Sequence, residues 1–334
     1  MTFLKSLSGA TAVLALMAGA ALAEPALIYD IGGKFDKSFN EAAFNGAERW
    51  AKETGGTYKE LEISDEAQRE QALRRLAESG ANPIVTTGFA MSDPLTKVAP
   101  DFPDTKFVTI DGWVDPATNP NVLSIGFSEH EGGYLVGMMA AMATKTGTVG
   151  FVGGMDIPLI RNFACGYAQG AKAVNADIKI VSSMTGTTPA AWNDPVKGAE
   201  LARAEIGQGA DVIYAAAGGT GIGVLQAAAD EGILSIGVDS NQNHLHPGQV
   251  LTSMLKRVDN AVYNSFTAGE ALDTAPLTLG LKEEGVGYAL DDNNKPLVSD
   301  EMKAKVDEAA AKIVAGEISV HDYRTDDTCP AMTF

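Results

Sequence analysis

Apolar runs of strand length alternate with segments of helical periodicity through the first half of the chain. The apolar runs occupy residues 26–30, 58–63, 83–87, 106–111 and 122–127. Residues 38–54, 65–79 and 92–99 instead carry apolar side chains three or four positions apart, which is typical of helices with one buried face. The pattern therefore predicts a series of strands, most of them separated by helices.

The same alternation restarts after residue 127. A long helix is predicted over residues 128–145, followed by strands at 148–152, 178–183, 211–216 and 234–239. Helices are predicted between these strands, at 158–175, 194–208 and 221–231. The last part of the chain differs, because residues 276–290 have the pattern of a β-hairpin and residues 299–315 that of a final helix.

Strands that alternate with helices form parallel sheets, because parallel neighbours need a long crossover connection. Two successive series of such units in 334 residues predict two sheets and two lobes. No Pro- or Ser-rich linker separates the two series, so we expect strand crossovers to join the lobes. The predicted fold class is α/β.

Three short motifs predict where helices begin. Ser38 and Ser128 each precede a Glu by three positions, which is the spacing of a capping box. Asp194 precedes Pro195, and an Asp followed by Pro is typical of a helix N-terminus.

The N-terminus has the pattern of an export signal. Lys5 precedes an apolar run over residues 10–22, and the run ends in Ala21-Leu22-Ala23. The run is shorter than a membrane span of about 20 residues, and its final small residues suit a signal peptidase. We expect residues 1–23 to be a signal peptide cleaved after Ala23, which makes the product periplasmic; an apolar N-terminal helix is the alternative.

The charge balance excludes some classes of partner. The chain has 25 Lys and Arg residues against 43 Asp and Glu residues, which gives a net charge of −18. Nucleic acids and anionic lipid surfaces are bound by clustered cations, so neither is an expected partner. Cys165 and Cys329 are the two cysteines, and in an oxidising compartment they either form a disulfide or remain separate thiols.

Three predicted strands end in an aspartate, at Asp30, Asp111 and Asp239. Each one alone is more often a turn or cap residue, but ligands of parallel sheets bind beyond the carboxyl ends of the strands. Carboxylates accept hydrogen bonds from diols and ring N–H groups and repel phosphates. The three together predict a cleft for a neutral or cationic ligand that is rich in donors.

Aromatic residues also lie near strand ends or helix starts, namely Phe39, Trp113, Trp192 and Tyr214. Two such rings can hold a planar ligand between them, although each ring alone more often packs in the core. Trp192 is favoured as a ligand contact because it lies in a polar loop, residues 187–194.

Other motifs are weak. The glycines of residues 218–223 are spaced G-x-G-x-G rather than as in a dinucleotide fingerprint, so they indicate only a close backbone approach to a ligand. His244 and His246 lack a third metal ligand in the sequence pattern. No hydrolase or metalloenzyme signature is present, so we expect neither catalytic residues nor a cofactor or metal.

Several ordered stretches together resemble one known family across nearly the whole chain after the signal. They are Asp36-Lys37-Ser38-Phe39-Asn40-Glu41, Trp192-Asn193-Asp194-Pro195 and residues 153–158, 217–221, 236–240 and 252–257. They resemble the basic membrane protein family of ABC-transporter substrate-binding proteins, in its purine-nucleoside-receptor-like branch. The resemblance implies a type I periplasmic-binding fold with two Rossmann-like lobes, a three-strand hinge and a ligand in the cleft. We expect residues 24–127 with about 256–277 in one lobe, and residues 128–255 with about 278–334 in the other.

The resemblance also implies roles for individual residues. Phe39 would stack on a purine, Asn40 would line the pocket, and Asp111 would accept hydrogen bonds from the base. Asp239 would hold ribose hydroxyls with help from Lys256 and the Gly219 backbone, and Asp30 would lie nearby. Trp192 or Tyr214 would supply the second stacking face. The chain departs from many family members in having no lipidation Cys after the apolar run, and its Ile31-Gly32-Gly33-Lys34 segment is variable in the family.

The resulting hypothesis is a monomeric periplasmic receptor that closes on a purine nucleoside or nucleobase and delivers it to an ABC-transporter membrane permease. One alternative is an exported nucleoside or glycoside hydrolase with Asp30 and Asp111 as its acid/base pair. The others are a receptor of the same fold for another ring, such as a flavin, and a sensor subunit that signals to a membrane kinase.

Overall fold

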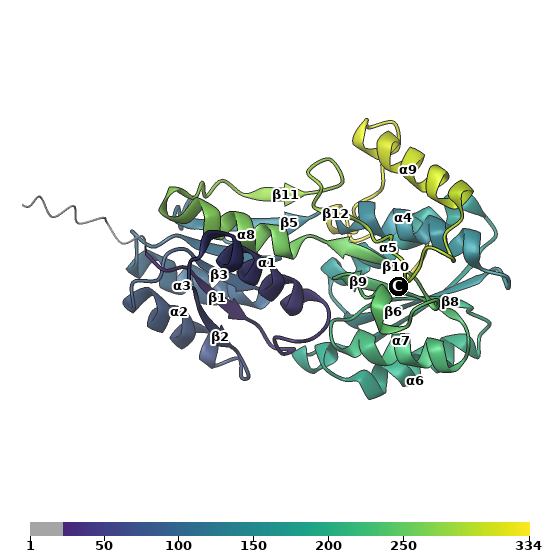
Figure 1. Cartoon of the computed structure of the whole chain (residues 1–334), viewed down its shortest axis with the longest axis horizontal. Helices are drawn as coiled ribbons and strands as arrows, with labels where there is room; N and C mark the ends of the chain where they lie inside the picture. Colours follow the sequence, from purple (N-terminus) through teal and green to yellow (C-terminus); the bar gives the residue numbers. More distant parts are fainter. Residues whose placement is uncertain (1–22) are drawn as a thin grey trace, which may run out of the picture.

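The first lobe is built on an all-parallel sheet in the order β11-β5-β4-β3-β1-β2 (Figure 1). Its strands are β1 Ala26–Tyr29, β2 Lys59–Glu62, β3 Ile84–Thr87, β4 Phe107–Ile110, β5 Val122–Phe127 and β11 Leu277–Leu279. The computed structural model describes residues 23–334, so the predicted signal peptide lies almost entirely outside the described residues.

The second lobe contains a sheet of matching order, β12-β10-β9-β8-β6-β7. Its strands are β6 Thr148–Met155, β7 Lys179–Gly186, β8 Val212–Ala216, β9 Leu234–Asp239, β10 Val250–Lys256 and β12 Val286–Tyr288. The strands are parallel except for β12, which runs antiparallel to β10. The repeated order confirms the α/β prediction and makes β4 and β9 equivalent positions in the two sheets.

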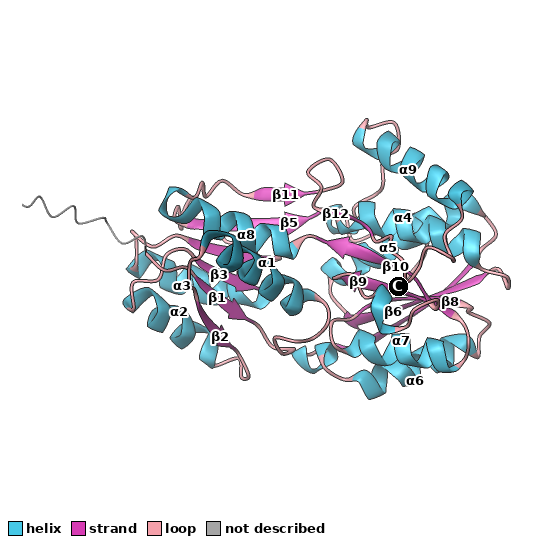
Figure 2. Cartoon of the chain, viewed as in Figure 1, coloured by secondary structure: helices cyan, strands magenta, loops and turns pink. Residues whose placement is uncertain are grey.

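Helices cover both faces of each sheet (Figure 2). In the first lobe they are α1 Phe39–Thr54 and α8 Val258–Ala268 on one face, and α2 Gln68–Glu78 and α3 Ser92–Val98 on the other. In the second they are α4 Glu129–Ala143 and α5 Pro158–Val174 against α6 Pro195–Ile206 and α7 Thr220–Asp230, with α9 Asp300–Val314 outside α4. Side chains alternate between the two faces, so that Leu27 packs toward α1 whereas Ile28 packs toward α2.

The chain crosses between the lobes three times, after Phe127, after Lys256 and between β11 and β12. The prediction of a hairpin over residues 276–290 is wrong, because β11 pairs with β5 of the first sheet and β12 with β10 of the second. Each of these short strands finds its hydrogen-bond partners on a different sheet edge. The third crossing therefore lies past residue 279, slightly beyond the boundary expected near 277.

Of the three side chains predicted to cap helix N-termini, one does so and two do not. The Asp194 side chain accepts the Lys197 N–H at the start of α6, as expected. The Ser38 and Ser128 side chains make no cap hydrogen bond. At α1 the carboxylate of Asp36 instead accepts the backbone N–H groups of Ser38, Asn40 and Glu41, at 2.8 to 3.1 Å. Strand β10 and helix α8 had no counterpart among the elements expected from the sequence.

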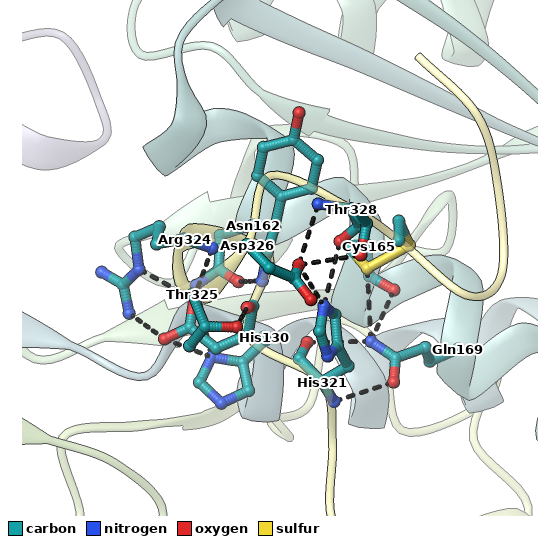
Figure 3. Close-up of a disulfide and its surroundings, with 12 residues drawn as sticks. His130, Asn162, Cys165, Gln169, His321, Arg324, Thr325, Asp326 and Thr328 are labelled. Carbon is teal, nitrogen blue, oxygen red and sulfur yellow. Dashed lines mark hydrogen bonds and ion pairs between the residues drawn. A yellow bond between two sulfur atoms is a disulfide. The ribbon is translucent and has the colours of Figure 1, made fainter.

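The C-terminal strap, residues 318–334, runs along α5 and is attached to it by a disulfide between Cys165 and Cys329. This pairing settles the alternative that the sequence left open. Around the disulfide, Gln169 bonds both the N–H and the C=O of His321, and the Asn162 side chain accepts the Tyr323 N–H (Figure 3). The strap is therefore a fixed part of the second lobe.

In residues 23–334, none of the helices combines the length and the apolar character that crossing a membrane requires.

Burial of Glu205 makes the stability of the second lobe depend on pH. Glu205 lies on α6 with no exposed surface, and burial raises the pKa of its carboxyl to about 8. The folded protein therefore keeps this proton up to about pH 8, whereas the unfolded chain releases it near its ordinary pKa of 4.5. Stability is consequently lost as the pH rises from about 5 to 8.

We expect Glu205→Gln to raise the free energy of unfolding at pH 8.5 by roughly 2 kcal/mol and to change it little at pH 4.5, because the amide needs no proton to be neutral. Urea denaturation at both pH values measures this. Glu200→Gln, at an exposed site on the same helix, is the control. A gain of equal size at both pH values would contradict the assignment.

Candidate functional site

A cavity of about 660 Å³, including its open mouth, lies between the lobes at the carboxyl ends of both sheets. Both lobes and the second crossing contribute to its wall. The lining residues are Asp30, Ile31, Gly32, Asp36, Phe39, Asn40, Gly88, Phe89, Asp111, Leu159, Ile160, Phe163, Trp192, Ala216, Ala217, Gly218, Val238, Asp239 and Lys256.

Most of the candidate site residues from the sequence are brought together on this wall. They are Asp30, Phe39, Asn40, Asp111, Trp192, Asp239 and Lys256. Gly219 does not line the cavity, but it follows the lining residue Gly218 and is the N-cap residue of α7. Trp113, an aromatic candidate at a strand end, is 64% exposed and also lies outside the lining.

The placement of Tyr214 corrects the sequence interpretation. Its ring is completely buried in the core of the second lobe, 5.4 Å from the ring centroids of both Phe151 and Tyr167. Tyr214 lies within β8, two residues before the strand ends at Ala216. Tyr214 and Ala216 point to the same face of β8, toward α4 and α5, but Tyr214 lies deeper in the strand and packs in the core, whereas Ala216 at the carboxyl end reaches the cavity.

Asp111 and Asp239 occupy equivalent places at the ends of β4 and β9. Both adopt left-handed backbone conformations, with φ of 68° and 61°. Such angles are uncommon for residues other than glycine and are concentrated at functional sites. The two carboxylates thus approach one cavity from the carboxyl edges of two different sheets.

Lys256, the last residue of β10, holds a buried cluster of charges where the lobes meet. Its Nζ lies 2.6 Å from Asp111 Oδ2 and 3.1 Å from Glu129 Oε1, and all three side chains are at most 7% exposed. Burial alone lowers the pKa of Lys256, but the carboxylates of Asp111, Glu129 and Asp239 reverse this and raise it. Burial raises the pKa of Asp111 to about 6, and the ammonium limits that rise.

A second carboxyl cluster joins the lobes across the cavity. Ser38, whose hydroxyl is not used for capping, donates it to Asp239 Oδ2 on the opposite lobe. The Ser240 hydroxyl donates to the Ser38 carbonyl, at 2.8 Å, and Gln242 Nε2 to the Lys37 carbonyl, at 2.9 Å. These contacts describe a closed arrangement of the lobes. Burial raises the pKa of the neighbouring Asp36 to about 7, and its three backbone donors limit the rise.

Asp30 is held in place by groups of its own lobe. Arg69 on α2 binds both of its carboxylate oxygens, at 2.9 and 3.2 Å. The Asn40 side chain donates to the carbonyls of Asp30 and Gly33 and accepts from the Thr87 hydroxyl. Asn40 lines the cavity, and its side-chain amide also fixes the loop of residues 30–33 that follows β1.

Aromatic and small residues shape the apolar part of the wall. The rings of Phe39, Phe89, Phe163 and Trp192 all line it. A side chain at position 154 would place its Cβ 2.2 Å from the Trp192 ring, so Gly154 leaves the space that this ring occupies.

Several lining residues were missed by reasoning from the sequence. Gly88 and Phe89 directly follow β3, so the strand-end rule that selected Asp30 also applies to them. Asp36 lay within a stretch that carried the family resemblance, but no role was assigned to it. Phe163 and Leu159 lie on α5, where helical periodicity indicates core packing and carries no signal for a site.

The arrangement is suited to binding. The carboxylate side chains of Asp30, Asp36, Asp111 and Asp239 belong to residues that line the cavity, together with the Lys256 ammonium and several aromatic residues. Within residues 23–334 no group of three or more His, Cys, Asp or Glu side chains is arranged to hold a metal ion.

Loss of Arg69 would leave Asp30 as an uncompensated carboxylate with a 14% exposed side chain. We expect Arg69→Gln to lower the free energy of unfolding by about 3 kcal/mol, because breaking a buried ion pair strands the partner charge. Urea denaturation measures this, and Arg74→Gln, at a more exposed pair with Asp101, is the control with a change below about 1 kcal/mol. The double variant Arg69→Gln/Asp30→Asn recovers most of the loss; no recovery would show that the charge of Asp30 is not the cause.

The chain is similar to a described protein family and to several known proteins. The family model described as "ABC transporter substrate-binding protein PnrA-like" matches residues 26–324. The chain is 32% identical to the "ABC transporter nucleoside-binding protein BmpA" of Lactococcus lactis, over 88% of each chain. It is 34% identical to the "CD4+ T-cell-stimulating antigen" of Listeria monocytogenes, over 88% of this chain and 87% of that protein.

Solved structures agree with this assignment. A solute-binding protein of an ABC transporter system from Aeropyrum pernix superimposes with a TM-score of 0.81 at 30% identity, covering 91% of this chain and 95% of that one. A solute-binding protein from Conexibacter woesei gives a TM-score of 0.73 at 26% identity, covering 90% of this chain and 99% of that one. Proteins of this kind bind a solute for an ABC transporter and are not enzymes, which confirms the expectation from the sequence. The chain belongs to the Bmp family of PnrA-like ABC-transporter substrate-binding proteins.

Proposed function

We propose that this substrate-binding protein is the periplasmic receptor of an importer for purine nucleosides or nucleobases. The observation that carries the proposal is a cavity between the lobes that is lined by carboxylates from both lobes and by aromatic rings. A purine offers flat faces to the rings and ring or amino N–H groups to the acceptors. The nucleoside-binding name of the Lactococcus lactis relative supports the same ligand class.

In the proposed complex the two ends of the cavity recognise different parts of the ligand. Phe39 stacks on the base, and Asp111 accepts its N–H groups beside Lys256, which is an additional donor. Asp239 accepts the ribose hydroxyls, near Asp30 and the Gly218–Gly219 backbone. Trp192 supplies the second ring face, with Phe163 on the same wall in place of Tyr214. A phosphate has no place here, because four carboxylates and one ammonium line the cavity.

Hinge closure is the proposed means of capture. The bonds from Ser38 to Asp239 and from Ser240 to Ser38 join opposite lobes, so they break when the lobes separate. A ligand bound by both lobes favours the closed form, in which the permease of the transporter receives it. We propose that the receptor works as a monomer and that residues 1–23 export it, with cleavage after Ala23.

Binding of inosine to the purified protein tests the ligand class directly. Calorimetry should give a dissociation constant in the micromolar range or below, and mass spectrometry of the denatured protein should detect a released purine. Absence of binding by inosine, adenosine, guanosine and their free bases would reject the proposal.

Asp239→Ala tests the ribose end. Loss of the carboxylate leaves the sugar hydroxyls unpaired in a buried site, so inosine should bind roughly 10- to 100-fold more weakly while hypoxanthine changes much less. Calorimetry on the two ligands measures the difference. Ser240→Ala, which removes a lobe-to-lobe bond without touching the Asp239 carboxylate, is the control and should affect both ligands alike. Equal losses of affinity for inosine and hypoxanthine in Asp239→Ala would contradict the ribose assignment.

The raised pKa of Asp111 predicts a pH-dependent affinity. Its carboxyl takes up a proton below about pH 6 and then no longer accepts two donors from the base. The dissociation constant of inosine should therefore rise by about tenfold from pH 7.5 to pH 5. Asp111→Asn should bind more weakly at pH 7.5 and show a flatter profile. An unchanged slope in that variant would assign the pH dependence to another group.

A further inference from the structure

A row of alternating charges runs from the C-terminal strap into the cavity. Arg324 Nη1 lies 3.2 Å from Glu129 Oε2, Glu129 Oε1 lies 3.1 Å from Lys256 Nζ, and Lys256 Nζ lies 2.6 Å from Asp111 Oδ2. Lys256 and Asp111 line the cavity, whereas Glu129 and Arg324 do not. Any effect of the last two side chains on a ligand would therefore pass through Lys256.

Glu129 is a completely buried carboxylate at the start of α4, directly after the first crossing between the lobes. Its neighbours of opposite charge are Lys256 and Arg324, and Asn162 donates to it at 3.2 Å. A buried carboxylate needs compensation by charge and hydrogen bonds. Without Arg324 that compensation would come mainly from Lys256.

Lys256 has three N–H donors, and one of them donates to Asp111 Oδ2, whereas Glu129 Oε1 lies 3.1 Å from Nζ as an ion-pair partner without a hydrogen bond. Because Lys256 lines the cavity, its ammonium also has donor capacity for an acceptor there. The rings of Phe39, Phe127 and Phe163 surround the ammonium, with centroids 5.0 to 5.3 Å away. A stronger pull from Glu129 would move the ammonium away from Asp111 and out of this position.

Arg324 is itself held rigidly. It binds both carboxylate oxygens of Asp322, and its Nη2 donates to the carbonyl of Phe127, the last residue of β5, at 3.0 Å. The strap that carries it is fixed to α5 by the Cys165–Cys329 disulfide and by Gln169 (Figure 3). The guanidinium thus contacts residues on both sides of the first crossing, Phe127 and Glu129.

We propose that Arg324 is a positioning residue for the ligand site: by neutralising Glu129, it keeps Lys256 paired with Asp111 and directed into the cavity. The C-terminal strap thereby sets ligand affinity without touching the ligand. This inference rests on the proposed function only for the choice of inosine as the probe.

Calorimetry with inosine on two variants of Arg324 and one control variant tests the role. Arg324→Gln should weaken binding roughly tenfold, and Arg324→Lys, which keeps a cation, should restore it to within about threefold of the parent protein. Arg161→Gln is the matched control, because Arg161 also holds the strap, through the Tyr323 hydroxyl, but has no contact with Glu129. Equal losses in Arg324→Gln and Arg161→Gln, or no rescue by Lys, would reduce Arg324 to a structural role.

A double-variant cycle separates charge neutralisation from simple anchoring of the strap. If Arg324 acts by neutralising Glu129, adding Arg324→Gln to Glu129→Gln should cost little further affinity. If Arg324 merely anchors the strap to Phe127, the loss should be the same in both backgrounds. Thermal unfolding without ligand shows that each variant is folded.

A ligand-free measurement keeps this inference distinct from the proposed ligand. In protein labelled with ¹⁵N-lysine, the Lys256 ammonium resonance, assigned by its loss in Lys256→Met, should shift in Arg324→Gln and remain in place in Arg161→Gln. If inosine fails to bind the parent protein, the proposed ligand is wrong and the resonance still decides the role of Arg324. An unmoved resonance would overturn the inference even where inosine binds.

Discussion

The ion pair between Lys256 and Asp111 is the interaction on which the binding site depends. Asp111 ends a strand of the first sheet, and Lys256 ends a strand of the second sheet at a crossing between the lobes. Both side chains are almost fully buried, so each charge needs compensation, which Asp111 receives from Lys256 and Lys256 receives from Asp111 and Glu129. The pair therefore ties the two lobes together at the same point where the cavity receives its polar groups.

The repeated topology of the lobes explains why the acidic groups converge. Parallel strands direct all their carboxyl ends to one edge, and two sheets of the same strand order face each other along these edges. Asp111 and Asp239 follow equivalent strands in the same unusual backbone conformation. A site built in this way is complete only when the lobes are together, which suits a protein that must capture a solute and later release it.

Several residues serve folding and the site at once. Asp36 caps α1 with three backbone hydrogen bonds and also faces the cavity, which leaves the Ser38 hydroxyl available for Asp239 on the other lobe. Arg69 compensates Asp30, and Arg324 compensates Glu129. Buried carboxylates in the cavity wall and directly behind it are therefore compensated by cations that do not line the cavity, a pattern consistent with a family that binds solutes rather than transforms them.

The local sequence pattern was enough to predict the alternation of strands and helices, the two-lobed α/β class and the aspartates at strand ends. These features depend on neighbouring residues and on the geometry of parallel sheets. The family was predicted from short motifs that occur in a fixed order. Only the tertiary structure decided that Cys165 meets Cys329, that β11 and β12 join different sheets, and that Asp36 rather than Ser38 caps α1. The same holds for Tyr214 in the core, Phe163 in the cavity wall, and Arg69, Glu129 and Arg324 behind it. In each of these cases the deciding contact, whether with an opposite charge, a second thiol, a sheet edge, a backbone N–H group or a neighbouring ring, is made only by folding and leaves no trace in the local sequence.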